Sequence, residues 1–228
     1  MVGKTLVAAD LHVGLEHSMS RKGVRVPLQS SKMAGRLASI AISQGCRDIV
    51  LLGDLKDQVS GASPATAAAL ADFFQRLSAA RCAVTLVPGN HDGDIARALP
   101  QSVGLASAGG MLLSDEGESV ALLHGHAMPS EAVAGSGTFV VGHRHFALRS
   151  GRATVPLWVR GEFGAGRRLV VVPPFNELLP GSSPKQAEGE RSFVAGALSA
   201  GRRMQAFTLD GTCLGELSAL AEVSAGET

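Results

Sequence analysis

The sequence predicts an α/β protein whose functional site lies at the carboxyl ends of its strands. Short apolar runs rich in Val, Leu and Ile recur along the chain, and runs of this kind are typical of buried strands. They comprise residues 5–9, 49–52, 84–87, 120–123, 139–141 and 169–172. Helical periodicity separates the first three runs, whereas short Gly-rich turns separate several of the later ones.

The front half of the chain alternates strands with helices. The first helix is indicated by apolar residues at helical spacing, namely Met33, Leu37, Ile40 and Ala41. The second has the spacing i, i+3, i+4, i+7 at Leu70, Phe73, Phe74 and Leu77. Ser63 is placed to cap this helix, with Pro64 at its first position. The β-α-β-α-β order predicts a parallel sheet with right-handed crossovers, and after Pro100 we expect a second, more antiparallel sheet packed against it.

Length and composition narrow the class of protein. The 228 residues include 21 Lys and Arg against 20 Asp and Glu, so bulk charge favours neither nucleic acid nor membrane. We expect one domain over residues 1–228 without a large cap domain. Three scattered cysteines exclude a disulfide framework, and no apolar run could span a bilayer, so we expect a soluble, cytoplasmic protein. One Trp and no Tyr argue against a module that stacks nucleic-acid bases.

Six of the seven histidines follow predicted strands, and Asp or Asn residues accompany them. In chain order the polar residues at strand ends are Asp10, His12, Asp54, Asn90, His91, Asp92, His124, His126, His143 and His145. The carboxyl ends of strands in an open α/β sheet meet at one edge, where ligands bind. Five strands are therefore expected to deliver imidazole, carboxylate and amide groups to one place.

Each motif taken alone also fits an ordinary turn. Asp and Asn bond their own backbone in turns, and alternating histidines can simply lie on a surface. Turn chemistry alone would need independent coincidences at the ends of five successive strands. The joint pattern therefore favours a metal site.

The types of ligand narrow the choice of metal. A mixture of Asp, Asn and His without thiolates suits Mn, Fe, Zn or Ni, and it disfavours Ca or Mg. The set is also too large for one ion. Two divalent ions about 3.5 to 4 Å apart would fit such a set and would clamp the attacking and leaving oxygens of a phosphoryl displacement. We expect Mn most of all.

The order Asp-x-His, Gly-Asp, Gly-Asn-His-Asp, His, Gly-His-x-His between Asp10 and His145 resembles the calcineurin-like metallophosphoesterase superfamily. The resemblance implies a sandwich of two packed mixed sheets flanked by helices. Further segments resemble the ICC-like branch that includes DNA-ligase-associated metallophosphoesterases, namely residues 14–16, 23–27, 53–56 and 172–176, followed by Gly181. Asp57 departs from that branch, in which we expect His after Lys56.

The resemblance also implies how the metals are held. Asp10, His12, Asp54 and His145 would hold one ion. Asp54, Asn90, His124 and His143 would hold the other, with Asp54 as the bridge. His124 is preferred to His126 because it directly ends its strand, and His126 would then contact phosphate or a ligand.

The reaction implied is in-line attack on phosphorus by a hydroxide held between the metals. His91 would protonate the leaving oxygen, and Asp92 would orient the His91 ring. Arg144, Lys56, Arg21 and Arg25 are further candidates for substrate phosphates, although long cations in loops usually face water.

These expectations describe a phosphodiesterase, and the branch resemblance favours a DNA endonuclease or nuclease linked to DNA repair. The partners would then be a phosphate ester, DNA, and repair proteins such as a DNA ligase, with no membrane. One alternative is a phosphodiesterase or phosphomonoesterase acting on small nucleotides. Another is an inactive scaffold, which the complete set of motif residues disfavours. The segment 181–192 is expected to be a polar loop.

Overall fold

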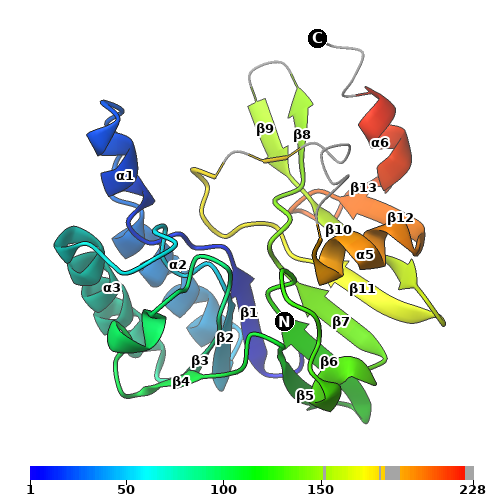
Figure 1. Ribbon diagram of the computed structural model, residues 1–228, viewed down its shortest axis with the longest axis horizontal. Coiled ribbons are helices and arrows are strands. Elements are labelled where there is room, and N and C mark those ends of the chain that lie inside the picture. The colour runs from blue at the N-terminus through cyan, green and yellow to red at the C-terminus, as the bar shows by residue number, and fades with distance from the viewer. Residues whose placement is uncertain (151–152, 180, 183–190, 224–228) are drawn as a thin grey trace. The chain divides into compact units, whose positions relative to one another are not determined.

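The structure is a computed structural model that describes residues 1–150, 153–179, 181–182 and 191–223. It comprises two compact units, Met1–Ala108 and Gly109–Thr228, each with its own sheet (Figure 1). Most of the expected polar loop, residues 183–190, lies outside the described part. The expectation of one domain over the whole chain stays a prediction.

The first unit contains a four-stranded sheet in which every pair of neighbours is parallel, as the sequence predicts. Its strands, in sheet order, are β1 (Thr5–Ala9), β2 (Asp48–Leu52), β3 (Ala83–Val87) and β4 (Val103–Leu105). The last residues of the first three strands, Ala9, Leu52 and Val87, are in register. The residues that follow these strands therefore leave the sheet at one edge.

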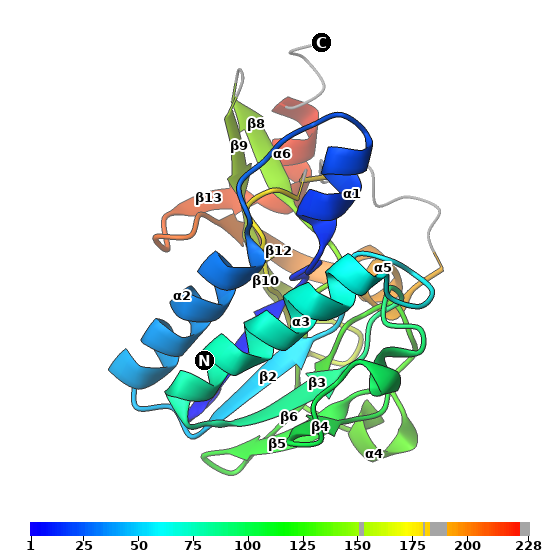
Figure 2. The same ribbon diagram turned by 90° about the vertical axis from the view of Figure 1, so that its left-hand side faces the viewer.

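Two long helices lie side by side on one face of this sheet, α2 (Ser30–Ser43) and α3 (Pro64–Leu77) (Figure 2). They share a face because right-handed crossovers that advance the strand order in one direction place each helix on the same side. The predicted cap of α3 is confirmed, since Ser63 Oγ accepts a hydrogen bond from Thr66 N at 3.2 Å. The short α1 (Leu15–Arg21) was not predicted, because seven residues are too few to show an apolar period. Two 3₁₀ turns complete the unit, η1 (Ser78–Ala80) and η2 (Ile95–Arg97).

The second unit contains a seven-stranded mixed sheet in the order β13-β12-β10-β11-β7-β6-β5. Its strands are β5 (Met111–Asp115), β6 (Glu118–Leu123), β7 (Thr138–Val141), β10 (Trp158–Phe163), β11 (Arg167–Val171), β12 (Gly201–Phe207) and β13 (Cys213–Glu216). Only β6, β7 and β11 run parallel to one another, and the other neighbours are antiparallel, so the expected second, more antiparallel sheet is confirmed. It begins later than expected, because β4 follows Pro100 and still pairs in parallel with β3. A separate hairpin joins β8 (Ala147–Ser150) to β9 (Ala153–Pro156).

The core of the second unit contains a cluster of phenylalanines from three elements. Phe139, Phe163 and Phe193 have ring centroids 5.2 to 5.8 Å apart. Phe193 belongs to α5 (Phe193–Ser199), and α6 (Leu217–Val223) adds Leu217 to the same cluster. One short helix remains in this unit, α4 (Glu131–Ala134). Among the described residues, none of the helices has the length and apolar character required to cross a bilayer.

Candidate metal centre

The candidate ligands of the first unit are held where the loops after β1 and β2 continue side by side beyond the sheet. Asp10 N donates to Gly53 O at 3.1 Å, and His12 N donates to Asp54 O at 2.8 Å. These backbone hydrogen bonds extend the β1–β2 pairing past the last strand residues. They bring the Asp-x-His motif beside the Gly-Asp motif, as the sequence predicts.

Candidate ligands in both units have an unusual backbone conformation. Positive φ angles occur at Asp10 (58°), His12 (44°), Asp54 (47°) and, in the second unit, His143 (68°). Residues other than Gly rarely adopt this region, and each such residue costs on the order of 1–3 kcal/mol. Strained backbone of this kind concentrates at functional sites, and here four of the eight described non-Gly residues with positive φ are candidate ligands.

The imidazole of His12 lies between two carboxylates. Its Nε2 is 3.5 Å from Asp54 Oδ2, and its Nδ1 is 3.7 Å from Asp57 Oδ1. Burial lowers the pKa of His12, but hydrogen bonding to Asp54 and Asp57 and the charges of Asp54 and Asp10 outweigh it and raise the pKa to about 9. One ring nitrogen thus faces the candidate bridging carboxylate, while the other is engaged by Asp57.

Asp57 contacts two of the candidate site residues, His12 and His91, and the sequence did not reveal these contacts. Its carboxylate also accepts a hydrogen bond from Ser18 Oγ, and its backbone carbonyl lies 2.6 Å from His91 Nδ1. The hydrogen bond with His12, together with that from Ser18, outweighs burial, lowers the pKa of Asp57 and keeps it ionised. Arg21 Nη2 lies 3.3 Å from Ser18 Oγ, so a chain of polar contacts runs from an exposed guanidinium through Ser18 and Asp57 to His12. The only signal in the sequence was that Asp57 stands where the resembled branch led us to expect His.

Asp92 does not orient His91, which corrects the expectation from the sequence. The Asp92 carboxylate accepts hydrogen bonds from the backbone N–H groups of Gly89 at 2.8 Å, Leu55 at 3.0 Å and Lys56 at 3.3 Å. Burial raises the pKa of Asp92, and these hydrogen bonds act in the opposite direction. Asp92 therefore ties the turn after β3 to the loop after β2. The His91 ring is held by the Asp57 carbonyl and stands edge-on to His12, with ring centroids 4.8 Å apart.

Lys56 also differs from its expected role as a contact for substrate phosphate. Its side chain is buried, and Nζ donates to the backbone carbonyls of Gln58, Val59 and His91. Burial lowers its pKa, whereas nearby carboxylates raise it. All three ammonium protons are used within the protein. Lys56 therefore holds the two loops together and has no donor left for substrate.

Gly89 is required by the close approach of Asp54. A Cβ atom at position 89 would lie 2.3 Å from Asp54 Oδ1 and 2.4 Å from Asp54 N. In addition, His91 N donates to Asp54 Oδ1 at 2.8 Å. The turn after β3 thus fixes the orientation of the Asp54 carboxylate through a backbone amide and through the absence of a side chain.

The second unit supplies a cluster of histidines from the ends of β6 and β7. Leu123 and Val141 are in register, and Gly142 N donates to His124 O at 3.0 Å, so the two segments stay adjacent beyond the sheet. His124 Nε2 lies 3.1 Å from His143 Nδ1. The ring of His126 is farther away, with its centroid 5.3 Å from that of His124 and 6.2 Å from that of His143. This geometry favours His124 over His126 as the ligand paired with His143.

The remaining predicted site residues differ in their exposure to solvent. His145 is partly exposed, and its backbone carbonyl accepts from Ser182 N at 2.7 Å. Arg144, between the two histidines, is buried. Asn90 is exposed in the turn after β3, and Arg21 and Arg25 are exposed after β1, in keeping with solvated cations.

The distances between donor atoms within each unit fit coordination of a transition-metal ion. Two ligand atoms bonded to a tetrahedral ion at about 2.0–2.1 Å lie roughly 3.3 Å apart. The nitrogen pair of His124 and His143 at 3.1 Å and the His12–Asp54 pair at 3.5 Å match this spacing. Candidate ligands of the described chain are Asp10, His12 and Asp54 in the first unit and His124, His143 and His145 in the second. Imidazole and carboxylate donors without thiolate suit Mn, Fe, Zn or Ni.

Comparison with solved structures identifies the fold of this chain. The nuclease MPE from Pseudomonas putida matches with a TM-score of 0.55 and 24% sequence identity, over 85% of this chain and 85% of that chain. The fold is that of a calcineurin-like metallophosphoesterase. An archaeal phosphodiesterase also matches, with 11% identity and a TM-score of 0.38, over 75% of this chain and 83% of that one. No protein-family model matches the chain, and no curated protein does.

Proposed function

We propose that this metallophosphoesterase-fold chain is a metal-dependent phosphoesterase that hydrolyses phosphodiester bonds, with DNA as the favoured substrate. The observation that carries the proposal is the pair of strained, closely spaced donor sets, His12 with Asp54 in one unit and His124 with His143 in the other. Both sets follow the carboxyl ends of parallel strands, where ligands bind in sheets of this class. The fold shared with a nuclease supports the choice of reaction.

The assignment of ligands follows the family pattern in the sequence. Asp10, His12, Asp54 and His145 would hold one divalent ion. Asp54, Asn90, His124 and His143 would hold the other. Bound ions supply Lewis-acid chemistry, in that they activate water and neutralise charge on the phosphate.

The protein itself contributes by holding the His91 ring in place and by supplying a proton to the leaving oxygen. The Asp57 carbonyl oxygen can only accept a hydrogen bond, so we assign the ring hydrogen to His91 Nδ1, which donates a hydrogen bond to that oxygen. The other ring nitrogen, Nε2, can then hold the proton that passes to the leaving oxygen as its bond to phosphorus breaks. The attacking water releases a proton to solvent as its oxygen becomes bonded to phosphorus, and His91 takes up a proton from solvent before the next cycle.

The proposal is tested by stripping the protein with a chelator and restoring it with Mn²⁺, Fe²⁺, Zn²⁺ or Ni²⁺. Single-stranded DNA, duplex DNA, bis(p-nitrophenyl) phosphate and p-nitrophenyl phosphate are then compared as substrates. We expect diester hydrolysis that depends on metal, with Mn²⁺ the most effective. Asp54→Asn should lose both bound metal and activity.

Two results would overturn the proposal. The first is a protein that retains no metal after reconstitution, which would favour an inactive scaffold. The second is hydrolysis of small monoesters with no cleavage of any diester, which would move the substrate to small phosphate esters.

A further inference from the structure

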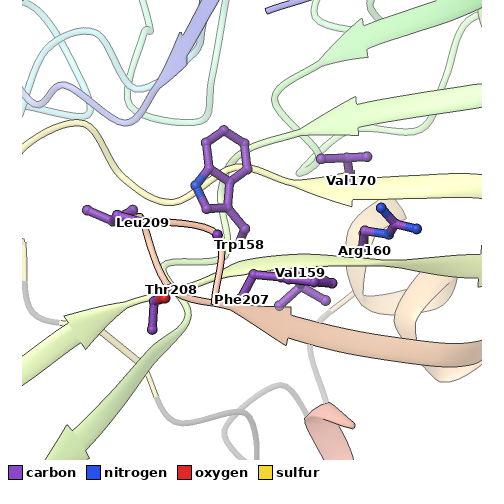
Figure 3. Close-up of a pocket in the computed structure, with 8 residues that line it drawn as sticks. Trp158, Val159, Arg160, Val170, Phe207, Thr208 and Leu209 are labelled. Carbon is purple, nitrogen blue, oxygen red and sulfur yellow. The ribbon is translucent and has the colours of Figure 1, made fainter. Parts of the chain in front are cut away.

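A shallow groove with a volume of about 380 Å³ lies on the seven-stranded sheet of the second unit (Figure 3). It is formed where β10, β11 and β12 lie side by side and where the chain turns after β12. The side chains that define it are Trp158, Arg160, Val170, Phe207 and Leu209. Nothing in the proposed chemistry uses any of them.

The alternation of side chains along the strands explains the groove. Val159 and Ala206 point into the core and are fully buried, so their neighbours Trp158 and Phe207 project from the opposite face. Trp158 and Phe207 are partners across β10 and β12 and present two adjacent aromatic side chains that are partly exposed. Leu209 beside them is 54% exposed. Contiguous apolar side chains on a protein surface often mark a binding site, and here Trp158 and Phe207 are partly exposed beside the exposed Leu209.

Arg160 is the one charged residue among those that line the groove. The Arg160 guanidinium lies 5.6 Å from the centroid of the Phe207 ring, and among the described residues it has no ion-pair partner. No carboxylate lines the groove. The nearest acidic residue in sequence, Asp210, is bound to its own turn, where it accepts from Thr208 Oγ1 and Thr212 N. Aromatic rings with an adjacent free arginine are the combination that binds nucleobases and their phosphates.

The groove shares a sheet edge with the histidines of the candidate metal centre. Leu123, Val141, Val171, Val159 and Ala206 form a continuous row of registered residues across β6, β7, β11, β10 and β12. His124 follows the row at one end, and because β10 runs antiparallel to β11, Trp158 precedes it on the same edge. Trp158 therefore lies two strands from β7, the strand that leads to His143, which is about 10 Å at ordinary strand spacing.

We propose that this groove binds a base of a single-stranded nucleic acid whose neighbouring phosphate reaches the histidine cluster. The inference rests on the proposed function, and it names the substrate class. A single strand is favoured because bases inside a duplex are stacked on one another and their faces are not available to side chains. Trp158 and Phe207 would stack on a single base, and Arg160 would pair with a backbone phosphate. The low aromatic content argues against a platform for several bases, whereas one base needs only these two rings.

The chain offers a direct reporter for this contact. Trp158 is the only Trp and there is no Tyr, so the intrinsic fluorescence of the whole protein comes from the groove. Titration of the full chain with an oligothymidylate of about 12 nucleotides, in a chelator so that no cleavage occurs, should quench this fluorescence. An oligomer of equal length made of abasic sites, with the same phosphates, should quench it far less.

Variants distinguish binding of the oligonucleotide in the groove from general electrostatic attraction to the protein. Phe207→Leu should weaken oligothymidylate binding roughly five- to hundredfold, as expected for loss of a stacking contact. Arg160→Gln should weaken binding and reduce its salt dependence. Arg202→Gln removes an exposed charge at the other end of β12 and should leave binding unchanged.

Failure of this inference can be told from failure of the proposed function, because the wild-type protein is assayed in parallel on bis(p-nitrophenyl) phosphate with Mn²⁺. Ester hydrolysis without quenching by the oligonucleotide would overturn the proposal that the groove binds a base and would leave the proposed phosphoesterase activity supported. Quenching without ester hydrolysis would support the groove and overturn the phosphoesterase. A change in the oligomeric state of Phe207→Leu with unaltered DNA binding would identify the groove as a contact between copies and overturn the inference.

Discussion

The backbone carbonyl of Asp57 lies 2.6 Å from Nδ1 of His91. The carboxylate of the same residue lies 3.7 Å from Nδ1 of His12, so position 57 holds two histidines by two different parts of one residue. Any residue could supply the carbonyl, but only an acidic one supplies the negative charge beside His12. This explains how Asp can stand at position 57 without loss of the His91 contact.

Asp57→Asn should weaken metal binding about 10- to 100-fold, because a hydrogen-bonded carboxylate raises the basicity of a ligand histidine and fixes its tautomer. The contact to His91 should persist, since the backbone is unchanged. Calorimetric titration of the chelator-stripped protein with Mn²⁺ measures the affinity. Asp72→Asn, which removes an exposed carboxylate bonded to Arg76, is the matched control. Equal affinity in Asp57→Asn and wild type would show that Asp57 does not support His12.

The metal-free protein should lose stability as pH rises from about 6.5 to about 9. The pKa of His12 is raised to about 9 in the folded chain, above its value of 6.5 in the unfolded chain. Its contribution is therefore complete below the unfolded value and disappears as the pH passes the folded one. Urea unfolding in a chelator at several pH values measures this. His12→Gln should flatten that part of the profile, and an unchanged slope in this variant would contradict the assignment.

Gly89→Ala should destabilise the fold by about 1–3 kcal/mol and impair metal binding, because the new Cβ would overlap the Asp54 carboxylate and amide. Gly35→Ala is a suitable control, since nothing lies within 4 Å of a Cβ at that position inside α2. The control should raise stability slightly, as alanine favours helix over glycine. Thermal unfolding and metal content are measured together. Wild-type metal content in Gly89→Ala would show that Asp54 can move without loss of the site.

Asp92→Asn should act on folding more than on chemistry. The amide can accept with only one oxygen where the carboxylate accepts three backbone N–H groups, so a loss of about 1–3 kcal/mol in unfolding free energy is expected. Chemical denaturation measures the loss. A variant with wild-type stability and a much reduced rate would restore the catalytic role first expected for Asp92.

His91→Ala should show the opposite behaviour. Removal of the proton donor should lower the rate of diester hydrolysis about 10²- to 10⁴-fold while bound metal stays constant. The comparison requires turnover and metal content from the same preparation. Turnover at the wild-type rate would remove His91 from the proposed mechanism.

Much of this molecule follows from local pattern. The strand β1 has the predicted bounds, and α3 begins at its predicted Ser63 cap, because buried strands and capped amphipathic helices have periods that a single sequence displays. The placement of Asp10 beside Asp54 was also predictable, since adjacent parallel strands in register deliver their next residues to one edge. The mixed sheet of the second unit was predictable only in character, because its strand order depends on pairings between distant segments.

The sequence by itself determined which residues are candidates for the metal site and at which strand ends they stand. Only the tertiary structure decided how these residues are supported: that Asp57 rather than Asp92 holds His91, that Lys56 is buried, and that Gly89 makes room for Asp54. The physical reason is that each of these contacts joins a side chain or Cβ position to backbone groups, and several of the partners lie on another loop. Backbone N–H and C=O groups are the same for nearly every residue, so side-chain spacing along the chain leaves their partners undetermined.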